Sequence, residues 1–178
     1  MKVYLARHGR TNYNDLGLRN ADPDVDVHLT KTGVSQANKL AEELKPIALE
    51  HIYVSELRRT QQTADIVNAF HHIPVTIDPR LNDNRSGFEG RPSTEYYGAL
   101  EKSKNKWSVR LSNGESIEDV KYRISQFIED LKQESYEQVL IVTSMVIIQI
   151  MHGAIDHLSN AQAWELQIDQ GSLSELEI

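Results

Sequence analysis

An arginine and a histidine stand at the end of the first apolar run of this chain. Arg7 and His8 directly follow the apolar residues 3–6, and Gly9 comes next. Arginine offers a planar fork of donors that suits phosphate oxygens, and a neutral imidazole can attack phosphorus as a nucleophile. Gly9 allows the backbone to turn tightly and to approach a ligand closely. On these residues alone, a phosphate site and a purely structural histidine at a strand end are equally good interpretations.

Short apolar runs alternate with segments of helical spacing along the chain. We expect strands over residues 2–7, 52–54, 73–77 and 139–142, and an edge strand over 173–178. The spacing of apolar residues predicts helices over 30–46, 55–70, 116–131 and 147–155, with Val34 and Phe70 on buried faces. This alternation predicts an α/β fold, a three-layer α/β/α sandwich with a mostly parallel central sheet. Ligands of such sheets lie beyond the carboxyl ends of the strands, where Arg7 and His8 stand.

Two segments are polar and irregular. Residues 8–30 are rich in Asn and Asp and are expected to form a long loop, and residues 78–114 contain two prolines and several glycines. A short helix from Thr94 to Lys102 is the one element expected inside the second segment. Long loops in compact domains usually carry function, so 78–114 is interpreted as a lid or a substrate-side insertion.

Composition restricts the classes of function. The chain has 178 residues, which suits a single domain over 1–178. Its net charge of −7 argues against nucleic-acid binding as the main role. Cysteine is absent, so thiolate chemistry is excluded. No histidine has metal-ligand spacing with a partner, and we expect neither a metal nor another cofactor.

The longest apolar run does not suggest a membrane protein. Val139 to Met151 is interrupted by Thr143, Ser144 and Gln149, and a bilayer needs about 20 apolar residues. The first expected strand begins within three residues of the start, which leaves no room for a signal peptide. We therefore expect a cytoplasmic, bacterial-type enzyme without a membrane partner.

Several blocks, in one order along nearly the whole chain, resemble the histidine phosphatase superfamily. This family contains cofactor-dependent phosphoglycerate mutases and small phosphoester hydrolases. The blocks are Arg7-His8-Gly9 with Thr11 and Asn14, Leu29-Thr30 with Gly33, Gln36 and Ala37, the run 55–64, the residues Leu81, Asp83 and 87–90, and Gly114-Glu115-Ser116. Several blocks in the right order are far more specific than any one of them.

The resemblance implies a role for each of five residues. His8 is implied as the nucleophile that forms a phosphohistidine. Arg7 and Arg59 are implied to neutralise the phosphoryl oxygens, and Asn14 to add a neutral donor. Asp83 is the candidate general acid for the leaving alkoxide.

Asp83 has a second interpretation, because its block is one residue shorter than the family pattern. A loop carboxylate that caps a turn between Asn82 and Asn84 explains the sequence equally well. Arg10 and Arg85 are further cations near the expected site. We interpret both as solvated surface residues, with contact to a second anionic group of the substrate as the alternative.

One position departs from the family pattern. The family has a second histidine after the strand at 139–142, and here the residue is Ser144, followed by Met145 in place of glycine. Gln149 falls where an arginine is common. A serine hydroxyl can donate one hydrogen bond to phosphate but carries no charge. Ser144 is therefore expected to bind phosphate, but to stabilise its negative charge less than a histidine would. The loss of one transition-state donor typically costs about 10²–10³ in rate.

No other imidazole is expected to replace the missing one. His152 lies two helical turns beyond Ser144, or roughly 12 Å along a helix axis at 1.5 Å per residue. His28 is not constrained by the sequence. The others are expected at the surface: His51, His71, His72 and His157.

Three functions remain open at this point. The first is a phosphomonoester hydrolase that acts through His8 on a small phosphorylated metabolite, at a reduced rate. The second is an inactive member of the family that binds a phosphorylated ligand, inorganic phosphate or a protein partner. The third is a phosphoglycerate mutase, ranked last because mutases carry insertions that this short chain does not have. A homodimer is left open.

Overall fold

The apolar run after Tyr136 forms the central strand of a five-stranded sheet. The computed structural model describes residues 1–178, and its strands are β1 (Lys2–Arg7), β2 (His51–Val54), β3 (Val75–Ile77), β4 (Gln138–Thr143) and β5 (Leu173–Glu177). Their order across the sheet is β3-β2-β4-β1-β5. The first four are parallel to their neighbours, and β5 runs antiparallel to β1 at the edge. The mostly parallel sheet is the one that the sequence predicts, although β3 is shorter than the predicted 73–77 and the strand order was not predicted.

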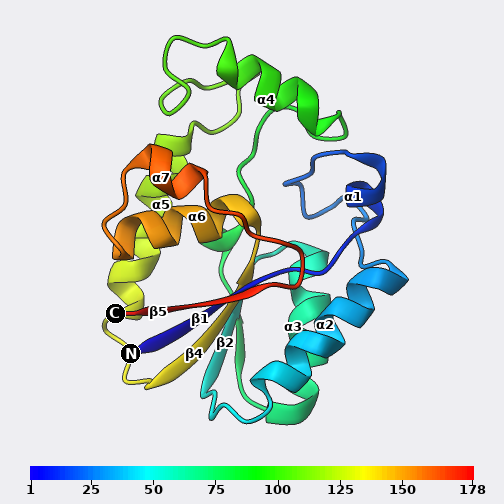
Figure 1. Ribbon diagram of the computed structural model, residues 1–178, viewed down its shortest axis with the longest axis vertical. Helices are drawn as coiled ribbons and strands as arrows, with labels where there is room; N and C mark the ends of the chain where they lie inside the picture. Colours follow the sequence, from blue (N-terminus) through cyan, green and yellow to red (C-terminus); the bar gives the residue numbers. More distant parts are fainter.

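Helices cover both faces of the sheet, as Figure 1 shows. They are α1 (Asn12–Leu16), α2 (Lys31–Leu44), α3 (Arg58–His71), α4 (Ser93–Glu101), α5 (Ile117–Leu131), α6 (Met145–Ile155) and α7 (Asn160–Trp164), with a 3₁₀ turn, η1, at Pro79–Leu81. The predicted α/β/α sandwich is confirmed.

Alternate residues of β4 build two separate cores. Val139 and Ile141 pack with α5 and α6, whereas Leu140 and Val142 pack with α2 and α3. A strand that is buried on both faces needs an unbroken apolar run, which explains the sequence of β4. The parallel register sets Arg7 of β1 opposite Thr143 of β4, so the residues that follow both strands emerge side by side.

The predicted helix boundaries are partly wrong. The loop expected over 8–30 contains the short helix α1, and α6 begins at Met145 instead of Ile147. The short helix α7 has no counterpart in the prediction. Val34 and Phe70, expected on buried faces, are 41% and 44% exposed. Helical spacing identifies a face but not its edges, and both residues lie at such an edge.

The segment 78–114 joins the larger core at Leu81 and Trp107, and its middle part lies away from both main cores. Its helix α4 stands above the rest of the molecule in Figure 1. It has a small apolar cluster of its own, made by Phe88, Tyr96 and Leu100. The chain contains no helix with the length and apolar character that crossing a bilayer requires.

Two glycines bring the loop after β1 against helix α2. A Cβ on Gly33 would overlap the carbonyl oxygen of Arg10, and a Cβ on Gly9 would overlap the carbonyl oxygen of Gly33. The backbones can meet only because neither residue has a side chain. This contact fixes the path of the chain immediately after His8.

Replacing Gly33 by alanine is expected to destabilise the protein by about 1–3 kcal/mol, because overpacking against backbone cannot be relieved by a rotamer change. The matched control is Gly98→Ala in α4, where an added Cβ meets no atom within 4 Å. The control is expected to stabilise by about 0.5–1 kcal/mol, the helix preference for alanine. Urea unfolding of both variants measures the difference, and equal free energies of unfolding would contradict the packing argument.

Candidate active site

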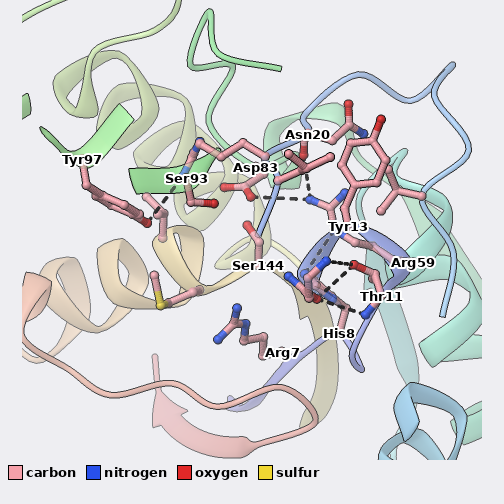
Figure 2. A pocket seen from close by; sticks show the side chains of 16 residues that line it. Arg7, His8, Thr11, Tyr13, Asn20, Arg59, Asp83, Ser93, Tyr97 and Ser144 are labelled. Carbon is pink, nitrogen blue, oxygen red and sulfur yellow. Dashed lines mark hydrogen bonds and ion pairs between the residues drawn. The ribbon is translucent and has the colours of Figure 1, made fainter. Parts of the chain in front are cut away.

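A polar cavity of about 100 Å³ lies beyond the carboxyl ends of β1 and β4. Side chains from the loop after β1, from the first turn of α3 and from the start of α6 point into it, as Figure 2 shows. Its polar lining residues are Arg7, His8, Thr11, Tyr13, Asn14, Arg19, Asn20, Arg59, Asp83, Ser93, Tyr97 and Ser144. All six residues that the sequence proposes for the site are therefore brought together.

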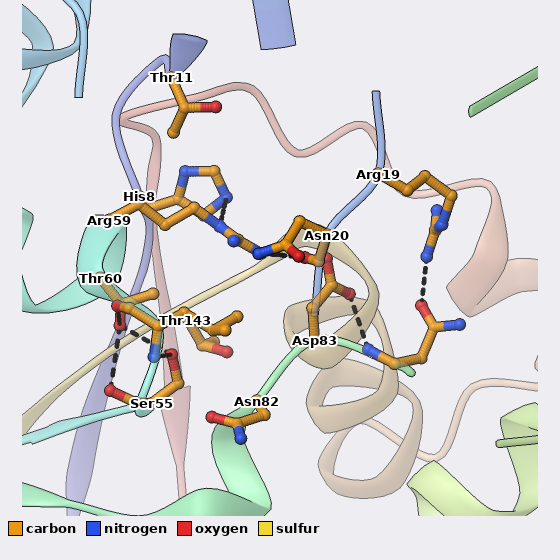
Figure 3. Close-up of polar contacts among 12 residues, drawn as sticks. His8, Thr11, Arg19, Asn20, Ser55, Arg59, Thr60, Asn82, Asp83 and Thr143 are labelled. Carbon is orange, nitrogen blue, oxygen red and sulfur yellow. Dashed lines mark hydrogen bonds and ion pairs between the residues drawn. The ribbon is translucent and has the colours of Figure 1, made fainter. Parts of the chain in front are cut away.

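His8 is held in one tautomer. Its side chain is buried, with 3% of the residue exposed, and Nδ1 lies 2.8 Å from the carbonyl oxygen of Gly9. A carbonyl oxygen can only accept, so Nδ1 carries the proton and donates. Nε2 then has a free lone pair, and it accepts a hydrogen bond from Nε of Arg59 at 3.1 Å (Figure 3).

The surroundings of His8 oppose its protonation. Burial lowers the pKa of the imidazole well below its usual value, and the positive charges of Arg59 and Arg7 lower it further. The hydrogen bond to Gly9 acts in the opposite direction but does not outweigh them. The ring is therefore neutral near neutral pH, which is the state that a nucleophilic imidazole needs.

Arg59 reaches the cavity from the first turn of α3. It is 4% exposed. Its Nη2 donates to the carbonyl oxygen of Asn20 at 3.0 Å and lies 3.5 Å from a carboxylate oxygen of Asp83. The neighbouring Arg58 turns outward and pairs with Asp26 at the surface. The hydroxyl of Ser55 accepts from the N–H of Leu57 just before the helix.

Arg7 has no carboxylate partner. One of its terminal nitrogens donates to the carbonyl oxygen of Ile168, in the loop before β5, and its Nε is buried without a partner. Burial lowers the pKa of this guanidinium, while the negative charge of Asp83 opposes the shift. This partly buried cation therefore has unused donors for an anion.

Two neutral side chains, Ser144 and Asn14, also line the cavity beside these cations. Ser144 is 3% exposed and directly precedes α6 as its N-cap residue, and its hydroxyl is buried without a hydrogen-bond partner. The amide oxygen of Asn14 accepts from the backbone and hydroxyl of Thr11 in a capping box, so its amino group is left for the cavity. Met145, next to Ser144, also lines the cavity.

Asp83 combines the two interpretations that the sequence leaves open. One carboxylate oxygen accepts from the backbone of Asn84 at 2.9 Å, which is the expected turn contact. The other oxygen faces Arg59 in the cavity. The side chain is 20% exposed, and it also lines a second cleft on its other side.

Sequence reasoning missed Arg19 and misjudged one histidine. Arg19 lies in the polar segment 8–30, where no motif marks it, yet it lines the cavity. Arg10 instead pairs with Asp15 at the surface, and Arg85 lines the second cleft. His51, expected at the surface, is 7% exposed and stacks on Tyr136.

Comparison with known proteins decides the family. The model of the histidine phosphatase superfamily (branch 1) matches residues 3–178. The chain belongs to this superfamily. It is 29% identical to the adenosylcobalamin/alpha-ribazole phosphatase of Escherichia coli K12, over 100% of this chain and 90% of that protein.

Two other relatives agree with this assignment. A putative phosphoserine phosphatase 2 of Hydrogenobacter thermophilus is 28% identical, over 98% of this chain and 88% of that protein. The crystal structure of the alpha-ribazole phosphatase of Shigella flexneri superposes with a TM-score of 0.87 at 28% identity, and the alignment covers 100% of this chain and 91% of that one. Relatives of this chain thus include proteins named as phosphatases of alpha-ribazole and of phosphoserine.

The pKa of His8 is expected to lie below the usual histidine range and to rise in Arg59→Gln, because that variant removes the nearest positive charge. A pH titration of the imidazole ¹⁵N signals measures both the pKa and the tautomer. Arg58→Gln is the matched control, since Arg58 faces the surface. An equal effect of both substitutions would contradict the local electrostatic explanation.

Proposed function

We propose that the protein is a phosphomonoester hydrolase that acts through a phosphohistidine at His8. The observation that carries this proposal is the neutral Nε2 of His8, which faces a cavity lined by two guanidiniums, those of the partly buried Arg7 and the buried Arg59. Membership of the histidine phosphatase superfamily and the phosphatase names of its relatives support it. The substrate is proposed to be a small phosphorylated metabolite.

In the first step Nε2 of His8 forms a bond to phosphorus while the bond from phosphorus to the ester oxygen breaks. Arg59 first exchanges its contact with Nε2 for a phosphoryl oxygen, which frees the lone pair. Arg7 supplies charge-assisted donors to the same group, and Asn14 and Ser144 supply neutral ones. Asp83 gives its proton to the leaving alkoxide, so an alcohol departs.

In the second step water attacks the phosphohistidine. Asp83 takes a proton from the water as its oxygen bonds to phosphorus, and the bond from phosphorus to Nε2 breaks. Inorganic phosphate and the neutral imidazole result. The hydrogen bond from Nδ1 to Gly9 keeps the ring oriented through both steps.

The rate is proposed to be low because Ser144 occupies the position of the family's second histidine. The unpartnered hydroxyl of Ser144 can donate one hydrogen bond to the phosphoryl group. It brings no positive charge to the transition state, where the phosphoryl oxygens need it most.

The same observation favours a second candidate function. A cavity that holds phosphate well but lacks one cationic donor suits a protein that binds a phosphorylated ligand without turnover. Thermal stabilisation by phosphate, with no hydrolysis across a broad panel of phosphoesters, would favour this second function over the first.

Replacing His8 by alanine is expected to abolish hydrolysis of an aryl phosphate at mildly acidic pH, because the nucleophile is removed. Release of the phenolate chromophore measures the rate. His28→Ala is the matched control and is expected to retain the wild-type rate, since His28 pairs with Asp26 at the surface. A wild-type rate equal to that of His8→Ala would disprove the hydrolase.

Ser144→His is expected to raise kcat by about 10²–10³ by restoring a cationic donor. Because Met145 follows directly, the double variant Ser144→His with Met145→Gly tests whether space limits the imidazole. Ser144→Ala is the control and is expected to lower the rate, since the hydroxyl is lost. If kcat stays at the wild-type value in a folded double variant, the limit lies in the acid or in the segment 78–114.

A further inference from the structure

Arg19 is a third guanidinium in the cavity, and neutral groups hold it. Nη2 donates to the amide oxygen of Asn84 at 2.7 Å, and Nη1 donates to the hydroxyl of Tyr97 at 3.4 Å. The guanidinium carbon lies 4.1 Å from the centre of the Tyr96 ring. These contacts leave Nε, which is buried and has no partner, and further N–H groups on the terminal nitrogens.

Arg19 has no carboxylate partner, although the chain is rich in acidic residues. The protein has 26 acidic residues, yet no carboxylate forms an ion pair with Arg19 or Arg7. Most other arginines, including Arg10 and Arg91, do pair with a carboxylate. Both guanidiniums are partly buried, and although burial lowers the pKa of Arg19, the negative charge of Asp83, which does not contact Arg19, raises it. The buried Nε of each has no acceptor in the protein, so this arrangement indicates a place where a ligand supplies one.

Arg19 is placed away from the reacting nitrogen. In Figure 3 Asp83 and Asn20 lie between the pair of His8 and Arg59 on one side and Arg19 on the other. Asp83 is the proposed donor to the leaving oxygen. A group that reaches Arg19 therefore belongs to the leaving group and not to the transferred phosphoryl.

The charges of the cavity side chains favour a substrate with one negative charge beyond those of its phosphoryl group. Arg7, Arg19 and Arg59 are three cations, and a phosphoryl dianion balances two of them. Asp83 is neutral when it carries the proton for the leaving oxygen. One positive charge remains, which a single carboxylate balances and a second phosphate dianion would exceed.

The other direction open to the leaving group repels an anion. The cleft on the far side of Asp83 is lined by five carboxylates, Asp22, Glu56, Asp83, Glu89 and Glu115, and by only two guanidiniums, Arg85 and Arg123. Glu115 already pairs with Arg123. A negative group on the substrate is thus directed away from this cleft and toward Arg19.

We propose that Arg19 binds a carboxylate on the leaving group of the phosphomonoester and so selects phosphorylated hydroxy acids. This proposal rests on the proposed hydrolase function. The fork of Arg19 suits a carboxylate, and Tyr96, Tyr97 and Asn84 hold the fork in place before the substrate arrives. Arg19 is then a specificity residue that no sequence motif marks.

Matched substrate pairs test the proposal. Phosphonooxyacetate is compared with ethyl phosphate, and 3-phosphonooxypropanoate with n-propyl phosphate, so that each pair differs in a terminal carboxylate. The wild-type protein is expected to favour the acid of at least one pair by about ten- to a hundredfold in kcat/KM, the value of charge-assisted hydrogen bonds. Arg19→Gln is expected to bring this ratio close to one, and Arg19→Lys to an intermediate value, because lysine keeps the charge without the fork.

Arg10→Gln is the matched control, because it removes the same charge from a surface arginine that pairs with Asp15. Its acid-to-alkyl ratio is expected to equal that of the wild type. The proposal is wrong if neither pair shows a preference, or if Arg19→Gln lowers kcat/KM equally for both members. In the second case Arg19 acts on the phosphoryl group or on the fold around α4.

A failure of the hydrolase proposal can be distinguished from a failure of this one. If neither type of ester is hydrolysed, titration calorimetry with the same pairs gives the ratio of dissociation constants instead. A preference for the acids that disappears in Arg19→Gln supports the carboxylate site even in a protein without turnover. Equal dissociation constants for acid and alkyl esters overturn it.

Discussion

The site depends on keeping an imidazole neutral beside buried positive charge. His8 and Arg59 are buried, and the partly buried Arg7 lies beside them, at the ends of β1 and α3. Each guanidinium makes a proton on the ring less favourable, and burial removes the water that would otherwise stabilise the charged ring. The lone pair of Nε2 is then available without an added base, and the same two cations attract the dianion that this nitrogen is proposed to attack.

This arrangement requires segments that are far apart in the chain to meet with little freedom. The N–H of His8 donates to the carbonyl oxygen of Thr143 at 3.0 Å, so the residue after β4 always emerges beside the nucleophile. Ser144 occupies that place because of the strand register and not because of its own chemistry. The unpartnered hydroxyl of Ser144 at this place is a consequence of the same parallel ladder.

Regular elements and motif residues could be predicted from the sequence, whereas long-range side-chain contacts could not. The apolar run of β4 and the helical spacing over 116–131 are local signals, and the structure confirms both elements. Arg7, His8 and Arg59 could be identified because family blocks mark their positions. Arg19 could not, because its role depends on Asn84 and Tyr97, more than 60 residues further along the chain. His51 was misjudged for a similar reason, since its burial comes from the ring of Tyr136 and a bond to Thr76.

Asp83 separates two regions of opposite charge, and this division has a consequence for the proposed chemistry. Asp83 lines both the cavity that holds the three guanidiniums and a cleft rich in carboxylates. A phosphomonoester that enters with its phosphoryl group toward Arg7 and Arg59 must place its ester oxygen near this boundary. The acid is then close to the one atom that needs a proton.

A carboxylate on the leaving group can only turn toward Arg19, while neutral or cationic parts are free to enter the acidic cleft. Asp83, which is proposed to donate the proton, thus also orients the substrate, because it lies between the positive potential of the cavity and the negative potential of the cleft.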